Sequence, residues 1–357
     1  MPCYQKGLTG AESQNTSYML SKNVCSIYKV QGESNMKVVM VNDCAFVGET
    51  LLKYMPNNVE RLHIKRTRGF WSKTFGLAFN ILRARGDVYH VHYLLQDCFL
   101  AARFGKRPLI GHAHGSDLRA ALRHPIWGRI VRHNLMNCDK VLVSTPDILA
   151  TAKKFREDAE YLPNPVDLEV FYPKPLAEHG GKKRVLIASD CNWAVKGTDI
   201  AIRALSKIKD KVEVSIIKHG VDFEKTLALA CSLGLHLNIL PKAPHEKMRE
   251  YYWNAEVVID RFKLGSLGVV SLEAIACGRP VVTYVSSEYP EYKDFPLKDV
   301  YQESEIAKSV LASSKELWRE QFNYLQKHHE TKSIIKRLLE IYSTVSFGDF
   351  SDSLKQK

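Results

Sequence analysis

The stretch IDRFKLGSLGVVSLEAIACGRPVV, at residues 259–282, decides the fold of this chain. Its first residues end an apolar strand, and a loop with two glycines, Gly265 and Gly268, leads into a segment of helical period that contains Glu273. Gly278 stands where such a helix ends, and a second apolar strand follows at once. A strand, a glycine loop, a helix and a further strand in this order predict one unit of a parallel α/β sheet.

Short apolar runs on both sides of this stretch alternate with helical segments in the same way. The earlier runs are MKVVMVN (36–42), VERLHIK (59–65), VYHVHYL (88–94), PLIGHAH (108–114), KVLVST (140–145) and AEYLPN (159–164), and the later ones are KRVLIAS (183–189), VEVSIIK (212–218), LHLNIL (235–240), AEVVID (255–260) and PVVTYV (280–285). Near-continuous apolar strands separated by helices indicate parallel sheets covered on both faces. We therefore expect an α/β protein with two Rossmann-like, doubly wound domains that face a central cleft, with ligands at the carboxyl ends of the strands.

Composition shifts along the chain give the expected domain boundaries. Residues 1–35 are polar without a clear period and are expected to be a disordered extension, or to lie upstream of a natural initiator at Met36. The segment PKPLAEHGGKK at 173–183 has the proline, glycine and charge content of a linker. The expected organisation is an N-terminal Rossmann-like domain at 36–172, a C-terminal Rossmann-like domain at 184–320, a helix at 321–345 that packs back toward the N-terminal domain, and a tail at 346–357.

Charge is concentrated in one part of the chain. The net charge is +12, and residues 61–133 hold fourteen Lys or Arg against three Asp. Such a surplus favours anionic partners, namely a membrane surface, a phosphorylated acceptor or nucleic acid, and nucleic acid ranks last because no binding module for it is present. No long apolar run, no signal peptide and no CxxC pair is found, so we expect a cytoplasmic protein with reduced thiols, peripheral to the cytoplasmic membrane face if it binds lipid.

The glycine loop and the helix after it have the chemistry of a diphosphate site. Free backbone N–H groups and the positive end of the helix dipole attract phosphate, and the carboxylate of Glu273 can accept hydrogen bonds from ribose hydroxyls. An ordinary structural loop is the alternative. The run GVVSLEAIACGRPVV from Gly268 onward resembles the nucleotide-sugar site of the family 4 retaining glycosyltransferases, which have the GT-B fold. The resemblance implies that Glu273 binds the ribose and that Gly268, Val269 and Val270 present N–H groups to the diphosphate.

The chain departs from this family at the sugar side of the donor site. The first glutamate of the family's E-x7-E pair falls on Gly265, within an ID-x-x-x-x-G-x-x-G loop. Asp260 either takes over part of that polar work or caps the loop.

A second match is SDCNWAVKGTDIAIRAL at 189–205. In the family, a lysine at the start of this helix and an arginine about six residues before it face the leaving diphosphate. Lys196 matches the lysine, whereas the position of the arginine is Asp190. Lys218 or Arg261 could replace the arginine in space.

A third match is GHAHGSDLR at 111–119. In the family, an H-G-x-D pattern places a histidine near the reacting sugar and the acceptor, and His114 is its match here, with Asp117 and Arg119 beside it. Metal binding by His112, His114 and Asp117 is the alternative, and we expect no metal, since these transferases stabilise the leaving group with side chains and helix dipoles.

Two further segments of the N-terminal half offer weaker candidates. His90 and His92 alternate in VYHVHYL, and we expect His92, at the strand end, to reach the cleft while His90 is a core residue. The loop in VNDCAFVGETLLKYM at 41–55 carries Gly48, which resembles a family glycine that touches the acceptor or the donor phosphate.

These matches combine into one expected activity, the transfer of a sugar from a nucleotide diphosphate sugar to a glycan, lipid-linked or phosphorylated acceptor with retention of configuration and without a cofactor. The expected residues are His114, Lys196 and Glu273 for catalysis, Lys196, Gly197, Asp260, Gly265, Gly268, Val269, Val270 and Glu273 for the donor, and Gly48, His92, Asp117 and Arg119 on the acceptor side. A catalytically inactive GT-B protein that binds nucleotide sugars or glycans, and a GT-B nucleotide-sugar epimerase, are the alternatives.

Overall fold

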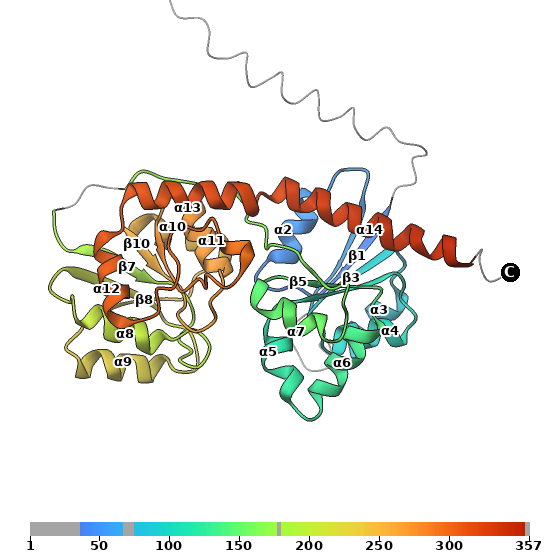
Figure 1. Ribbon diagram of the computed structural model, residues 1–357, viewed down its shortest axis with the longest axis horizontal. Helices are drawn as coiled ribbons and strands as arrows, with labels where there is room; N and C mark the ends of the chain where they lie inside the picture. The colour runs from blue at the N-terminus through green and yellow to red at the C-terminus, as the bar shows by residue number, and fades with distance from the viewer. Residues whose placement is uncertain (1–35, 67–74, 177–179, 354–357) are drawn as a thin grey trace, which may run out of the picture. The chain divides into compact units, whose positions relative to one another are not determined.

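A computed structural model describes residues 36–66, 75–176 and 180–353 of the chain (Figure 1). The extension expected at 1–35 lies outside the described residues, as do the last four residues of the expected tail.

Six parallel strands form the first sheet. They are β1 (Lys37–Val41), β2 (Glu60–Ile64), β3 (Val88–His92), β4 (Leu109–Ala113), β5 (Lys140–Val143) and β6 (Glu160–Tyr161). Their order in space is β2-β1-β3-β4-β5-β6, so the order reverses between β1 and β3. All residues of β3 and β4 are buried, which agrees with the near-continuous apolar runs of the sequence.

Helices cover both faces of this sheet. Side chains of one parity on the strands, such as Val39 and Val91, face a core that includes α3 (Leu77–Arg83), α4 (Gln96–Arg103), α6 (Trp127–Asn137) and α7 (Leu149–Lys153). Side chains of the other parity, such as Met40 and Val88, face α2 (Val47–Tyr54) and α14 (Thr331–Ser353). Figure 1 shows α2 and α14 on the side of the sheet opposite α4 and α6.

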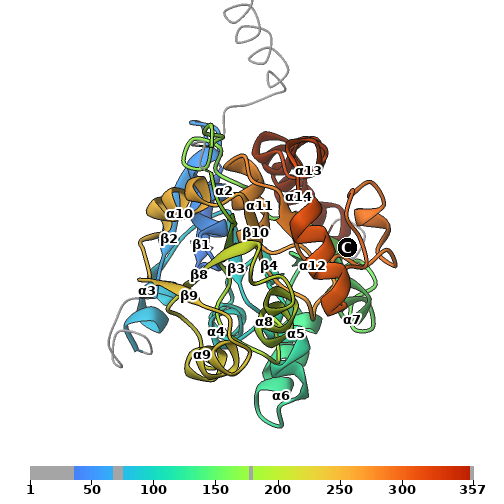
Figure 2. The same cartoon turned by 90° about the vertical axis from the view of Figure 1, so that its left-hand side faces the viewer.

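Five parallel strands form the second sheet, in the order β11-β10-β7-β8-β9. They are β7 (Lys183–Ile187), β8 (Val212–Ile217), β9 (Leu237–Leu240), β10 (Val257–Ile259) and β11 (Val281–Val282). One face carries α10 (Met248–Asn254), α11 (Val269–Ala276) and α13 (Lys315–His328), and the other carries α8 (Thr198–Ser206), α9 (Phe223–Ser232) and α12 (Glu303–Ala312). Figure 2 shows α10 and α11 on the face away from α8 and α9. The doubly wound α/β class is thereby confirmed.

The C-terminal segment differs from the single helix expected over 321–345. It is divided into α13 and α14, and α14 continues to Ser353, beyond the expected end. The break lies at His329, whose backbone leaves the helical region with φ −122° and whose buried Nδ1–H donates to the carbonyl oxygen of Asn164 at 2.9 Å. Beyond the break, Ile334, Leu338 and Tyr342 of α14 pack in the core of the first sheet.

Candidate active site

A cavity of about 500 Å³, called here the cleft cavity, lies at the carboxyl ends of strands from both sheets. This is the edge at which ligands bind in doubly wound sheets. Its walls come from the loops after β1, β4, β5, β7 and β10 and from the start of α11, namely Cys44, Ala45, Val47, His114, Ser116, Arg119, Ala120, Ser144, Thr145, Asn164, Ala194, Val195, Lys196, Arg261, Leu264, Leu267, Gly268, Val269 and Val270.

The start of α11 brings backbone N–H groups to this cavity. Gly268 is the N-cap in an extended conformation, with no side-chain hydrogen bond to the helix end, and Val269 and Val270 form the first turn. An α-helix leaves its first N–H groups without partners inside the helix and carries a partial positive charge there. A Cβ atom on Gly268 would collide with the carboxylate of Asp260 and the guanidinium of Arg261, so glycine is required for this close approach.

Two cationic side chains from neighbouring loops, Lys196 and Arg261, line the same cavity, in addition to Arg119. Their loops are joined by the N–H of Phe262, which donates to the carbonyl oxygen of Lys196 at 2.7 Å. Burial and the neighbouring charge of Arg261 lower the pKa of Lys196. Of the two residues that the sequence offered in place of the family arginine, Lys218 and Arg261, it is Arg261 that lies beside Lys196 on the cavity wall. Asp190, at the family arginine's own position, lies 3.8 Å from the Lys196 ammonium nitrogen.

Asp260 lies behind the cavity and does not line it. Its Oδ2 accepts a hydrogen bond from the Ser271 hydroxyl at 2.7 Å and lies 3.3 Å from the Arg261 Nε. Burial opposes ionisation of Asp260, but the charges of Arg261 and Lys196 outweigh it and lower the pKa of the carboxyl. The carboxylate therefore holds Arg261 and the start of α11 in place; direct contact with the donor sugar, one of its two expected roles, does not fit this position.

Gly265 and Gly197 serve the backbone of the two donor loops. Both have left-handed φ values, +60° and +70°, which glycine adopts without strain. Gly197 is the N-cap of α8, directly after Lys196. Gly265 accepts a backbone hydrogen bond from Ser286 at 2.9 Å. Neither residue is on the cavity wall, so their donor role is limited to shaping the loops.

Glu273 is buried one turn into α11, and both of its carboxylate oxygens have partners. The Tyr252 hydroxyl donates to Oε2 at 2.8 Å, and His245 Nε2 lies 2.5 Å from Oε1. Glu273 and His245 line a narrow second space with Phe46, next to the cleft cavity. A ribose that binds Glu273 would meet His245 at Oε1, a partner that the sequence motifs did not indicate because His245 precedes Glu273 by 28 positions.

His114 lies on the cavity wall at the end of β4, but Asp117, one of its two expected neighbours, does not. Asp117 is fully buried and accepts hydrogen bonds from the N–H groups of Leu94, Gly115 and Leu118 at 3.1, 2.9 and 3.1 Å. Burial raises the pKa of Asp117, against the effect of these hydrogen bonds. The predicted contact of Asp117 with the acceptor is corrected, since its carboxylate closes the loop after β4.

Of the remaining acceptor-side predictions, His92 and Gly48 do not line the cavity, whereas Arg119 does. His92 is fully buried, and Gly48 packs against it, since a Cβ atom there would lie 2.9 Å from His92 Nε2. Both lie behind the wall, so the expectation that His92 reaches the cleft is corrected. Arg119 does line the cavity, but Asp147 holds it through two hydrogen bonds of 2.6 and 2.8 Å.

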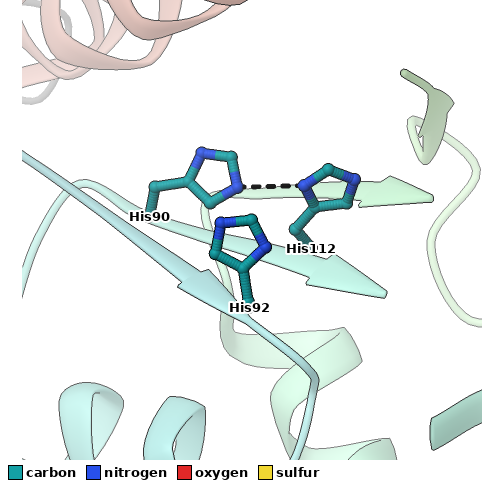
Figure 3. Close-up of side chains that lie close together, drawn as sticks. All are labelled: His90, His92 and His112. Carbon is teal, nitrogen blue, oxygen red and sulfur yellow. Dashed lines mark hydrogen bonds between the residues drawn. The ribbon is translucent and has the colours of Figure 1, made fainter. Parts of the chain in front are cut away.

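Three buried histidines behind the cavity have the spacing of a metal site (Figure 3). Ligand nitrogens of His90, His92 and His112 all lie within 4.8 Å of one another. Burial lowers the pKa of each imidazole, so the rings are neutral, as ligands must be. In this structure His90 Nε2 lies 3.1 Å from His112 Nδ1 and His90 Nδ1 lies 2.7 Å from the Tyr342 hydroxyl, while His112 Nε2 is buried without a hydrogen-bond partner among the described residues. The ligand set considered from sequence, with Asp117, does not form, because that carboxylate is engaged by backbone.

Solved structures with the same arrangement of two sheets define the class of protein. Sucrose-phosphate synthase from Thermosynechococcus elongatus superposes with a TM-score of 0.65 at 15% identity, over 86% of this chain and 98% of that one. HepE from Anabaena, solved in complex with UDP and glucose, superposes with a TM-score of 0.65 at 13% identity, over 87% of this chain and all of that one. The fold is GT-B, as the sequence resemblance implied.

Sequence comparison gives the family. Glycosyltransferase Family 4 matches residues 45–170, and Glycosyl transferases group 1 matches residues 171–294, directly after it. The chain belongs to the family 4 glycosyltransferases and is an enzyme of glycosyl transfer. The GPI3 subunit of phosphatidylinositol N-acetylglucosaminyltransferase from Saccharomyces cerevisiae is 21% identical over 88% of this chain and 77% of its own. A GDP-mannose-dependent phosphatidylinositol monomannoside mannosyltransferase from Mycolicibacterium smegmatis is 29% identical over 54% of this chain and 56% of its own.

Proposed function

We propose that this glycosyltransferase takes its sugar from a nucleotide diphosphate sugar and retains the anomeric configuration. The observation that carries the proposal is the meeting of three positive groups on one cavity: the first turn of α11, Lys196 and Arg261. Together they suit a diphosphate, which bears charge before the reaction and gains more as the glycosidic bond breaks.

The lining of the cavity also supports retention. No Asp or Glu is among the described residues that line it, which favours a step without a carboxylate nucleophile or a carboxylate base. In the proposed step, the bond from the anomeric carbon to the phosphate oxygen breaks, and the bond to the acceptor oxygen forms on the same face. The acceptor's proton passes to the leaving phosphate oxygen, whose charge Lys196 and Arg261 stabilise.

The acceptor is proposed to be a phosphorylated lipid. The names of the yeast and mycobacterial relatives both contain phosphatidylinositol, an anionic lipid. None of the helices that the structure describes is long and apolar enough to span a bilayer. Such an acceptor would therefore be met at a membrane surface.

The helices α3 and α6 offer a surface for this contact. Both pack against α4, and they expose apolar side chains among arginines, with Phe79 54% and Ile126 67% exposed. The exposed set is Phe79, Leu82, Arg83, Ile126, Trp127, Arg129, Arg132 and Met136. Cationic and apolar groups together bind anionic bilayers in a salt-sensitive manner.

Co-sedimentation with vesicles that contain phosphatidylinositol tests this surface. Ile126→Asp should release the protein, whereas Val221→Asp, at an exposed apolar residue of the other half, should not. Equal binding to neutral vesicles would contradict recognition of anionic lipid by this surface, and no binding to any vesicle would favour a water-soluble acceptor.

The proposed donor and stereochemistry are tested by a turnover assay. The protein is incubated with a panel of UDP- and GDP-sugars and a phosphatidylinositol acceptor, and the anomeric configuration of the product is read by NMR. A product with the donor's configuration supports the proposal, and an inverted product contradicts it. Donor binding without any product would indicate a binding protein, and an altered nucleotide sugar without acceptor would indicate an epimerase.

A further inference from the structure

A row of side chains runs from the core of the first sheet to the cleft cavity. Met40 of β1, His92 of β3 and His114 after β4 lie on the face of the sheet that α2 and α14 cover. His92 Nε2 lies 3.0 Å from the Met40 sulfur, and His92 Nδ1 lies 2.7 Å from His114 Nε2. We propose that Met40 and His92 are positioning residues that fix the tautomer of His114, with its Nδ1 left unprotonated toward the cavity.

The first step concerns the sulfur of Met40. A thioether sulfur has lone pairs and no hydrogen, so it can only accept a hydrogen bond. The proton at this contact must therefore reside on His92 Nε2. If that nitrogen were bare, its lone pair would face the lone pairs of sulfur at 3.0 Å inside a fully buried site.

The second step derives the tautomer of His114 from that of His92. A neutral imidazole carries one N–H, so His92 with its proton on Nε2 has an accepting Nδ1. Burial and the neighbouring histidines lower the pKa of His92 and of His114, which keeps both rings neutral. His114 must then donate its Nε2–H across the 2.7 Å contact, and its own Nδ1 is the unprotonated nitrogen.

The third step concerns what this nitrogen meets. Across the described residues, no hydrogen bond of the structure uses His114 Nδ1, while the ring lines the cleft cavity. An unprotonated nitrogen there accepts a hydrogen bond from a hydroxyl of the sugar or of the acceptor and so orients that hydroxyl. The other tautomer would present an N–H and orient the hydroxyl in the opposite sense. This inference rests on the proposed function, in which those hydroxyls occupy the cavity.

The position of Gly48 independently supports close packing around the His92 imidazole. A Cβ atom at Gly48 would lie 2.9 Å from His92 Nε2, the nitrogen that faces Met40. The start of α2 thus approaches the imidazole as closely as glycine allows.

The test reads the tautomers directly, by long-range ¹H–¹⁵N correlation on protein labelled with ¹⁵N-histidine. We expect Nε2–H and a bare Nδ1 for both His92 and His114. Met40→Leu keeps the volume and removes the acceptor, and His92→Leu removes the relay, so each should give a mixture of His114 tautomers. His92→Asn places an accepting Oδ1 where Nδ1 was and should preserve the His114 tautomer.

Kinetics give the second readout. In Met40→Leu and His92→Leu, His114 no longer orients one hydroxyl by a hydrogen bond, and kcat should fall about fivefold with the donor KM unchanged. The kcat of His92→Asn should stay near that of the parent protein. An Nδ1–H on His114 in the parent protein, or a tautomer indifferent to all three substitutions, would overturn the inference. So would one zinc ion per purified chain held by His90, His92 and His112. If the substitutions shift the tautomer as expected but the parent protein transfers no sugar, the relay is upheld and the proposed function is rejected.

Discussion

Phe46 and His245 stack face to face, with ring centroids 3.8 Å apart and ring planes at 1° to each other. Phe46 follows β1 of the first sheet, and His245 follows β9 of the second. The stack places His245 Nε2 2.5 Å from Glu273 Oε1. The carboxylate proposed to bind ribose is therefore occupied by a side chain that is itself held across the cleft.

Replacing Glu273 should weaken donor binding. In Glu273→Ala, the ribose hydroxyls lose a charged acceptor, and hydrogen bonds to charged groups contribute about 1.5–3 kcal/mol. We expect affinity for UDP or GDP, measured by calorimetry, to fall at least about tenfold. Glu246→Ala, at an exposed residue near the same loop, serves as the control. Unchanged affinity in Glu273→Ala would place the ribose elsewhere.

Replacing His245 should have the opposite effect. His245→Ala removes the side chain that competes with ribose for Oε1 of Glu273, while Tyr252 still donates to Oε2. A released hydrogen bond of about 1 kcal/mol corresponds to roughly fivefold tighter binding of the nucleoside diphosphate. The same calorimetric titration measures it. Weaker binding in this variant would show that His245 contacts the donor and does not obstruct it.

Removal of the Lys196 ammonium group should lower the rate of transfer more than the affinity for the donor. In Lys196→Ala, the charge that develops on the leaving diphosphate loses its ammonium partner, and loss of one such group typically costs about 10²–10³ in kcat. Steady-state kinetics measure the effect. Lys263→Ala, at an exposed lysine two positions after Arg261, is the matched control. Equal loss of activity in both variants would contradict a specific role for Lys196.

The strands and the start of α11 could be predicted because they depend on local patterns. Apolar runs at strand spacing and a glycine loop before a helix are readable along the chain. The layer in which a side chain lies is not local. His92 and His114 stand at neighbouring strand ends, yet β1 and α2 cover the first while the second lines the cavity. Partners distant in sequence, such as Tyr252 and His245 for Glu273, leave no signal in a motif.

Arg261 is a second residue whose place in the site could not be predicted from a local motif. The family arginine before Lys196 falls on Asp190, and Arg261, which lines the cavity with Lys196, follows another strand, β10. Only the parallel pairing of β7 with β10 brings the two strand ends together. The sequence offers Arg261 and Lys218 as candidates, and the strands before both residues pair directly with β7. The cavity lining selects between them, because Arg261 lines the cavity with Lys196 and Lys218 does not.

Acid should destabilise this protein well before its carboxylates are protonated. Burial lowers the pKa of His112 to about 3 and that of His329 to about 4, and it also lowers the pKa of His90, His92 and His114. Below pH 6.5, the unfolded chain binds protons at these histidines and the folded chain does not. Stability is therefore complete above pH 6.5 and is lost as the pH falls toward the folded-state values.

At pH 5, each such histidine should cost about 2 kcal/mol of unfolding free energy. Urea denaturation at pH 7.5 and pH 5.0 measures the sum. His329→Gln can still donate to the carbonyl of Asn164 but does not titrate, so it should reduce the difference between the two pH values. His219→Gln, at an exposed histidine, should leave the difference unchanged. Equal stability of the parent protein at both pH values would show that folding does not lower the pKa of these imidazoles.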